Sequence, residues 1–273
     1  MTAHEPAESK PPRNTDTRGA VGKALEVLAA LASPGGPHRL ADLARRCGLP
    51  KPTTHRMLQT MTEAGFALGE GGLYHVGPRM LGMSAAVLAG NRATRFTRPV
   101  LRDLQRRTGH TVHYAVRHGD RAVYVEKVEP EQAYRMNSQI GGEVPLYCTA
   151  VGRAMLSRLP AEDVAAVLTG PLPARTAHTL TDPAAIRAEL AAAADRGWVV
   201  EDEQNEPHVR CVAAPVLDGL GQVLGAISVS GLTFTLPRDA AEDLGPLVAD
   251  AAARVSGALA EGGPAMRLVS DAD

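Results

Sequence analysis

Residues 39–66, RLADLARRCGLPKPTTHRMLQTMTEAGF, predict two short helices joined by a tight corner. In the first helix Leu40, Leu43 and Ala44 recur at helical spacing, so one of its faces is apolar. Gly48 allows the chain to reverse direction between the helices. The two prolines that follow are tolerated in the first turn of the second helix, because the N–H groups there have no partner within the helix.

The second helix of this pair has an apolar rear and a polar front. The rear is expected to face a core. The front suits a helix that reads DNA, because Arg and Gln can pair bidentately with base edges, while Lys and Thr can hold phosphates. The rear residues are Thr54, Met57, Leu58 and Met61, and the front residues are Lys51, Thr53, His55, Arg56, Gln59 and Thr60.

A short hairpin is expected after the helix pair. Gly65 ends the second helix, and residues 66–68 and 73–76 predict two strands around a turn at residues 69–72. A helix pair with a polar front could be an ordinary structural hairpin, but the added ribbon favours a winged helix-turn-helix, whose wing can contact the DNA backbone or minor groove. We predict that DNA is contacted by Arg39, Lys51, Thr53, Thr54, His55, Arg56, Gln59 and Tyr74.

Length and composition limit the possible classes of protein. A chain of 273 residues is long enough for two domains. The net charge is −1, so affinity for a polyanion must come from a local patch. The three cysteines have no paired spacing, which predicts no disulfide framework and fits a reducing cytoplasm. We find no apolar run of about 18 residues and no apolar signal segment, so we expect no membrane span.

The composition predicts five segments along the chain. Residues 1–18 are polar and proline-rich and are expected to form a disordered tail. Residues 19–78 form the winged helix, in which a helix at 21–32 packs through Val21, Leu25, Leu28 and either Leu31 or Ala32. Residues 79–94 form an apolar linker helix, which either packs on its twin in a dimer or is buried against the next domain. Residues 95–260 form a second domain, and residues 261–273 a frayed tail.

The second domain is expected to be an α+β domain around an antiparallel sheet. Strands come first, then a helical insert, then further strands and a last helix. The expected strands are 111–116, 121–128, 133–139, 198–200, 211–217 and 223–230, and the expected helices are 96–107, 149–158, 161–168, 183–196 and 237–260.

One polar cluster could carry chemistry. His208, Cys211 and Cys148 could be imagined as a metal site, but zinc ligands usually have tighter spacing. A Cys148 nucleophile with a histidine base lacks a third orienting group. The acidic run 201–203 could be a plain solvated loop. We therefore predict no metal, no cofactor and no catalytic residue.

A ligand pocket is the better interpretation of this region. Two loops, 141–152 and 201–211, are expected to flank the sheet. Ser228 and Ser230 lie on one face of their strand, because side chains alternate with period two. The backbone N–H groups where the helix starts at Thr149 would favour a carboxylate. Convergent polar groups of this kind are typical of ligand pockets, although an ordinary polar strand face looks similar.

Stretches in both halves resemble the IclR family of bacterial transcriptional regulators, from about residue 19 to about residue 260. The second half is the more specific match, since the helix-turn-helix alone would fit many families. The matching stretches are AVGKALEVLAAL (20–31), RLADLARRCGLPKPTTHRML (39–58), YHVGPRML (74–81), VPLYCTAVGRAML (144–156), DRGWVVEDEQNEPHVRCVAAPVLD (195–218) and LGAISVSG (224–231).

The resemblance implies a winged helix, a linker helix and a C-terminal effector domain of GAF/PAS-like α/β shape. It also implies a homodimer or homotetramer, a palindromic operator and a small organic acid as effector. Val151 is bulkier than usual, Arg153 stands for the usual Lys, and His208 stands where Gly is common. By the resemblance, the effector would be bound by Met136, Val144, Ala150, Val151, Glu201, Asp202, Val209, Cys211, Ser228 and Ser230.

These observations predict a cytoplasmic, ligand-responsive, DNA-binding transcriptional regulator without catalysis. The sign of regulation, repressor or activator, depends on where the operator lies. An alternative is a GAF-like metal-dependent or hydrolytic enzyme with a DNA-binding anchor, which would show bound metal or turnover. A further alternative is a scaffold that binds DNA constitutively and ignores ligands.

Overall fold

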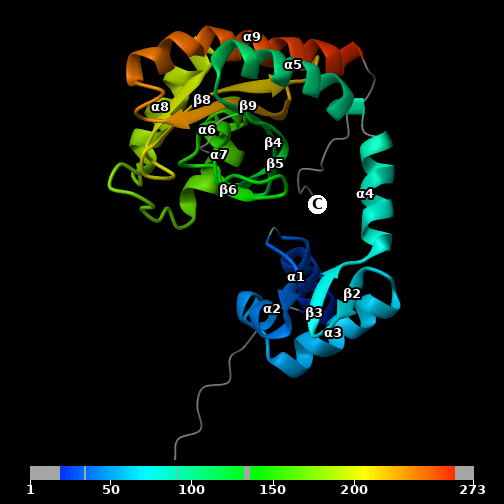
Figure 1. Ribbon diagram of the computed structural model, residues 1–273. Coiled ribbons are helices and arrows are strands. Elements are labelled where there is room, and N and C mark those ends of the chain that lie inside the picture. The colour runs from blue at the N-terminus through cyan, green and yellow to red at the C-terminus, as the bar shows by residue number, and fades with distance from the viewer. Residues whose placement is uncertain (1–18, 34, 91, 132–135, 262–273) are drawn as a thin grey trace, which may run out of the picture. The chain divides into compact units, whose positions relative to one another are not determined.

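The computed structural model describes residues 19–33, 35–90, 92–131 and 136–261 (Figure 1). The chain divides into two compact units, Met1–Ala86 and Val87–Asp273, and the division falls within the segment expected as a linker helix. The tails expected at 1–18 and 262–273 lie outside the described residues, while residue 261 still belongs to the last helix. None of the described helices combines the length and apolarity that crossing a membrane requires.

The N-terminal unit is a three-helix core with a small antiparallel sheet. Gly48, at φ 63°, adopts the left-handed conformation that the corner between the two expected helices requires. Leu43, Leu58 and Val27 are fully buried where the three helices meet. The elements are α1 (Ala20–Ala32), β1 (His38–Arg39), α2 (Leu40–Cys47), α3 (Lys51–Glu63), β2 (Ala67–Glu70) and β3 (Leu73–Val76), with sheet order β1-β3-β2.

Two details of this unit differ from the prediction. Helix α1 buries Val27 and Leu31, whereas Val21 and Leu25 are 74% and 60% exposed, so the expected packing face was wrong for those two residues. The wing has a third strand, β1, paired with β3, and its turn is tighter than expected. Only Gly71 and Gly72 connect β2 to β3, both at positive φ, which such a two-residue hairpin turn requires.

Helix α4 (Pro78–Gly90) covers most of the expected linker, and α5 (Arg92–Thr108) follows it. The apolar side chains Leu81, Met83 and Val87 of α4 are exposed.

The C-terminal unit is built on a six-stranded antiparallel sheet in the order β6-β5-β4-β9-β8-β7. Alternation along β9 sends Ile227 and Val229 to one face, where α5 and α9 cover them, and Ala226 and Ser228 to the other (Figure 1). The strands are β4 (Thr111–His118), β5 (Arg121–Val128), β6 (Glu143–Pro145), β7 (Val199–Asp202), β8 (Val209–Leu217) and β9 (Val223–Leu232). The helices after α5 are α6 (Ala150–Leu156), α7 (Ala161–Thr169), α8 (Pro183–Arg196) and α9 (Arg238–Glu261).

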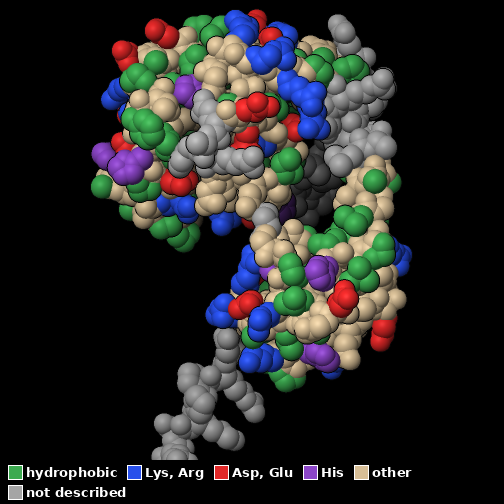
Figure 2. Space-filling model, in the orientation of Figure 1, with side chains coloured by type: hydrophobic (Ala, Val, Ile, Leu, Met, Phe, Trp, Pro, Cys, Tyr) green, Lys and Arg blue, Asp and Glu red, His purple; other side chains and the backbone are tan. Residues whose placement is uncertain are grey.

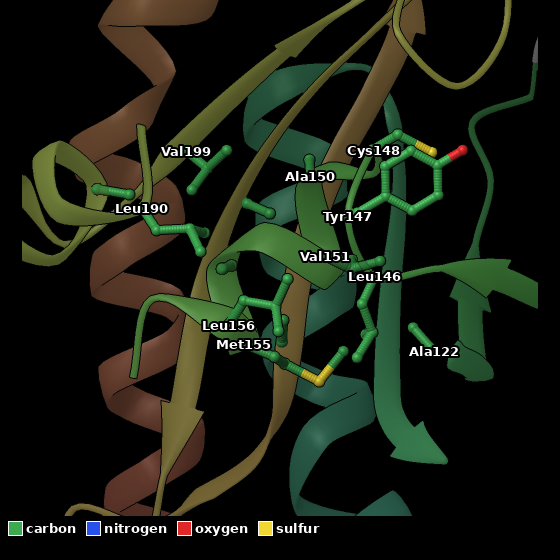
Figure 3. Packing of buried hydrophobic residues seen from close by; sticks show 14 of the residues in the cluster. Ala122, Leu146, Tyr147, Cys148, Ala150, Val151, Met155, Leu156, Leu190 and Val199 are labelled. Carbon is green, nitrogen blue, oxygen red and sulfur yellow. The ribbon is translucent and has the colours of Figure 1, made fainter. Parts of the chain in front are cut away.

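Short helix α6 lies within the core on the second face. Figure 3 shows side chains from α6 and from the segment before it packed together, with Leu190 and Val199 contributed from neighbouring elements. Helix α6 starts at Ala150 because the hydroxyl of Thr149 accepts a hydrogen bond from the N–H of Gly152 at 3.1 Å. This cap fixes the end of α6 that faces the sheet's polar residues.

The predicted two-domain α+β fold is confirmed, but the third expected strand was wrong. Of the expected strand 133–139, residues 133–135 lie outside the described part and residues 136–139 are not a strand. The sheet instead gains β6, within a stretch expected to be an irregular loop. The pairing extends through Gly141 and Gly142, whose backbone hydrogen-bonds Tyr124 of β5 at 2.7 and 3.1 Å.

Candidate DNA-reading surface and ligand cavity

The front of α3 is open to solvent. Lys51, His55, Arg56 and Gln59 are exposed on this helix, and Thr53 is half-buried in its first turn. Leu58 and Met61 are buried on the opposite side, against α1 and α2. The helix therefore presents the polar surface that reading base edges requires.

Thr54 does not belong to this surface. Its side chain is fully buried, and its hydroxyl donates to the carbonyl of Pro50 at 3.2 Å, so the expectation that it contacts DNA is corrected. Tyr74 is half-buried because its ring packs on the three-helix core and lies against Gly69. Arg39, in β1, is exposed as a DNA contact requires.

Further basic residues lie beside α3, and the sequence interpretation did not include them. Arg45 and Arg46 are exposed on α2, and Arg45 pairs with Asp42 at 2.7 Å. Figure 2 shows Lys and Arg side chains gathered along the edge of this unit where Figure 1 places α2. The wing itself, residues 67–76, contains no Lys or Arg and exposes Glu70. Positive charge is thus concentrated on the helices.

The second face of the large sheet holds a cavity of about 220 Å³. All the residues expected to bind an effector, except Asp202, line this cavity. They are Met136, Val144, Ala150, Val151, Glu201, Val209, Cys211, Ser228 and Ser230.

Strand pairing explains why these distant residues meet. Glu201 of β7 lies opposite Cys211 of β8, which in turn lies opposite Ser230 of β9. The neighbouring row places Ser228 opposite His113 of β4. Because residues in register across a sheet share a face, one polar strip crosses four strands beneath the cavity.

Asp202 points away from this strip. It follows Glu201 in the same strand, so its side chain projects from the other face of the sheet. Its carboxylate accepts hydrogen bonds from Arg210, at 2.6 Å from Nη2 and 2.8 Å from Nε. Asp202 therefore serves an ion pair and is removed from the expected cavity residues.

His113 is a cavity residue that the sequence interpretation missed. Its ring lies 2.7 Å from the Ser138 hydroxyl through Nε2, and 3.4 and 3.5 Å from the hydroxyls of Ser228 and Ser230 through Nδ1. Burial, helped by the positive charge of Lys127, lowers the pKa of His113 to about 3. The imidazole is therefore neutral, and it adds a polar but uncharged group to the floor of the cavity.

The loop between β7 and β8 forms one wall. Oε1 of Glu201 accepts the N–H groups of Gln204 and Asn205 at 2.5 and 3.0 Å. This loop contains two non-glycine residues at positive φ, Glu203 at 54° and His208 at 63°. The left-handed conformation gives a physical reason why glycine suits position 208.

Arg153 holds the same loop in place through a hydrogen bond to Gln204. Its guanidinium is fully buried and donates to the carbonyl of Tyr147 at 2.8 Å, to Gln204 Oε1 at 2.5 Å and to Glu189 Oε2 at 2.5 Å. A planar group with several donors can serve three directions at once, which a lysine ammonium at this position could not match in geometry.

The outer rim of the cavity carries both signs of charge. Glu143, Arg175 and Glu206 line it and are exposed. Nε of Arg175 donates to the carbonyl of Asn205 at 3.2 Å, which ties the segment around Arg175 to the loop. Neither Arg175 nor Glu206 was singled out from the sequence.

The polar cluster near Cys148 has no arrangement suited to metal or nucleophilic chemistry. Within the described ranges, no three His, Cys, Asp or Glu side chains gather as a metal site would need. Burial raises the pKa of the Cys148 thiol to about 11, which keeps it protonated rather than nucleophilic.

Comparison with known proteins agrees with both halves of the chain. The family described as IclR helix-turn-helix domain matches residues 20–68, and the family described as bacterial transcriptional regulator IclR C-terminal matches residues 85–257. The acetate operon repressor of Salmonella typhimurium is 34% identical over 246 residues, covering 88% of this chain and 89% of that protein. The transcriptional repressor AllR of Escherichia coli is 30% identical, covering 88% and 90%.

Solved structures show the same architecture. An IclR transcriptional regulator from Silicibacter has a TM-score of 0.74 at 31% identity, with 89% of this chain and 96% of that chain covered. An IclR homologue from Microbacterium hydrocarbonoxydans, crystallised with 4-hydroxybenzoate, has a TM-score of 0.75 at 24% identity, with 88% and 99% covered. The relatives named here are regulators of transcription, so the enzyme alternative has no support. The chain belongs to the IclR family of bacterial transcriptional regulators.

Proposed function

We propose that this regulator binds a small organic acid in the cavity of its C-terminal unit and that the occupied cavity changes its affinity for an operator. The observation that carries the proposal is the convergence of the expected effector residues on one cavity. Its volume, about 220 Å³, is below the range of roughly 300–1,000 Å³ for drug-sized ligands, which suits a small metabolite. The Microbacterium relative binds a ligand of this class, 4-hydroxybenzoate.

The DNA-reading residues are those on the exposed front of α3. Arg56, Gln59 and His55 face outward from the middle of the helix, where base edges would lie. Lys51 and Thr53, at its start, are placed to hold phosphates, as is Arg39 in β1. Tyr74 can contribute through its hydroxyl end alone, since its ring packs inward.

The working form is a homodimer or homotetramer on a palindromic operator in the cytoplasm. Exposed apolar side chains on α1 and α4, Val21, Leu25, Leu81 and Met83, provide surface for such an assembly. Two recognition helices would then meet half-sites about one helical turn apart. The effector shifts the equilibrium between two arrangements of these helices only by its difference in affinity for them.

Two variants separate the two sites. The double variant S228A/S230A should lose binding of 4-hydroxybenzoate or of short aliphatic carboxylates in calorimetry, while operator binding in a fluorescence anisotropy assay is retained. The Arg56→Ala variant should show the reverse pattern and serves as the matched control. Unchanged acid binding in the double variant would reject this cavity, and operator binding that ignores every acid would favour a constitutive DNA binder.

A further inference from the structure

Glu201 is a buried carboxyl group in the wall of the cavity. It is 2% exposed, although Asp and Glu are rarely buried without a counter-charge. Across the described part of the chain, no Lys, Arg or His forms an ion pair with it. Its Oε1 accepts two backbone N–H groups, the Cys211 thiol also hydrogen-bonds its carboxyl group, and the residue lines the cavity.

The two arginines that are buried in the described part of the chain both bind other partners. Arg153 donates to Tyr147, Gln204 and Glu189, and Arg210 binds Asp202 and the carbonyl of Leu236. The positive charge of Arg153 acts on Glu201 only at a distance. Glu201 thus holds a polar position in the cavity without a neutralising contact.

The titratable and charged groups around Glu201 come from several strands, from α6 and from the loops beside the cavity. Burial raises the pKa of Glu201 to about 7, against the backbone N–H groups of Asn205 and Gln204, the charge of Arg153 and the Cys211 thiol, which lower it. The other titratable or charged side chains that line the cavity or act on Glu201 are His113 of β4, Tyr124 of β5, Glu143 of β6, Cys148 before α6, Arg175, and Glu206 of the loop.

A ligand carboxylate in this cavity would place a second negative charge beside Glu201. Two carboxyl groups at one site cannot both ionise cheaply, so they tend to share a proton. A protonated Glu201 would turn from an acceptor into a hydrogen-bond donor toward the ligand oxygen. The neutral His113 and the serine hydroxyls of the floor bring no positive charge that could replace this proton.

Building on the proposed function, we propose that Glu201 holds a proton and shares it with a small carboxylate bound in this cavity, and that binding takes this proton up from solvent wherever Glu201 is ionised in the unliganded protein. The regulator then responds jointly to the concentration of the acid and to pH.

The sign of the pH dependence follows from this coupling. Below the pKa of the unliganded protein, Glu201 already carries the proton and the acid binds at its full affinity. Above that pKa, each pH unit should weaken binding about tenfold, until the raised pKa of the complex is reached. The Glu201→Gln variant keeps a neutral donor of the same shape, so its affinity should not change over this range and should exceed that of the natural protein at high pH.

Calorimetry on the full chain tests the coupling. 4-Hydroxybenzoate and short aliphatic carboxylates are titrated between about pH 6 and about pH 8.5, around the raised pKa, in two buffers of different ionisation enthalpy. We expect uptake of nearly one proton at the high end in the natural protein and none in E201Q. The matched control is Glu206→Gln, which removes an exposed carboxyl from the rim of the same cavity and should keep the slope with pH.

A second measurement does not depend on the variant's folding. In protein labelled with ¹³C at glutamate carboxyl groups, the chemical shift of Glu201 should titrate near neutral pH. The pKa obtained from this titration should rise when the acid is added. The coupling would be overturned if the affinity for the acid rose with pH or if E201Q bound no acid at any pH. It would also be overturned if Glu201 titrated in the ordinary range of a carboxyl group. If no acid binds any variant, the proposed function itself fails; binding without proton uptake overturns only the coupling.

Discussion

At the scale of single residues, side chains that alternate along β7 and β9 lie either beside the cavity or on the opposite face of the sheet. Ser228 and Ser230 could be placed on one face from the period of a strand, and both line the cavity. Adjacent Glu201 and Asp202 could not be told apart in this way until the face of β7 was known, and only Glu201 points inward. His113 was missed because its site depends on the pairing of β4 with β9, which lie far apart in sequence.

Arg153 contributes to the stability of the C-terminal unit, because its guanidinium hydrogen-bonds three separate partners. Replacing it with Met keeps much of its volume but leaves Gln204, the carbonyl of Tyr147 and Glu189 without their donor. We expect a loss of about 2–4 kcal/mol in the free energy of unfolding, measured by urea denaturation. Arg153→Lys should recover part of it, since an ammonium can reach fewer of the three partners. Equal stability of all three proteins would contradict this account of Arg153.

Arg56 is the most direct test of base reading. The Arg56→Ala variant should lose about 1–3 kcal/mol of operator binding and relax discrimination at one base position, if its guanidinium reads a base edge. Lys51→Ala is the matched control, because loss of a phosphate contact should weaken all sequences alike and lower the salt dependence. Anisotropy titrations on the operator and on single-base variants measure both. A uniform loss from Arg56→Ala would reassign it to the DNA backbone.

At the scale of elements, helices with a single apolar stripe were predicted well. Helices α2, α3 and α8 occupy the expected positions because their apolar residues, prolines and glycines agree. Helix α1 carries apolar residues on more than one side, so periodicity alone could not select the face with Val27 and Leu31. Strand β6 is three residues long and owes its place to pairing with β5, which local sequence does not reveal.

The composition of the wing predicts that it contributes less to DNA binding than the helices do. With Glu70 exposed and no Lys or Arg between residues 67 and 76, the wing should add little to affinity through phosphates. Glu70→Lys should therefore raise affinity for operator and unrelated DNA alike, and should steepen the salt dependence by about one phosphate contact. Glu70→Gln provides the matched control for loss of negative charge alone. Should Glu70→Lys leave both affinity and salt dependence unchanged, the wing tip must lie away from the DNA.

At the scale of the whole molecule, buried titratable groups set how stability depends on pH. Burial raises the pKa of Glu201 to about 7 in the folded protein. Its contribution to the free energy of unfolding is therefore fully present below the pKa that it has in the unfolded chain, and this contribution is lost as the pH rises through the folded-state pKa. His113 makes the protein less stable at acid pH. Its pKa is lowered to about 3 in the folded protein, so the free energy of unfolding falls as the pH drops below the ordinary pKa of a histidine.

A pH series of denaturation curves isolates the first effect. Between about pH 5 and about pH 8 the natural protein should lose roughly 3 kcal/mol through Glu201, whereas E201Q should not show this loss. The two proteins should therefore differ most at the alkaline end, with E201Q the more stable. Parallel curves for the two proteins over this range would show that Glu201 ionises normally in the folded state.

Under the proposed function, binding of an acid in the cavity and binding of the operator by the front of α3 each change the affinity of the other. Thermodynamic linkage makes this claim quantitative, because an effector that changes operator affinity by some factor must have its own affinity changed by the same factor when operator is bound. The S228A/S230A variant removes the cavity's hydroxyl groups without touching α3.

The decisive measurement is therefore operator affinity with and without saturating acid, paired with acid affinity with and without operator, in the natural protein and in S228A/S230A. The account predicts one matching factor, on the order of 5- to 150-fold, in the natural protein and no change in the variant. Operator affinity that is the same with and without every acid that binds the cavity would contradict it.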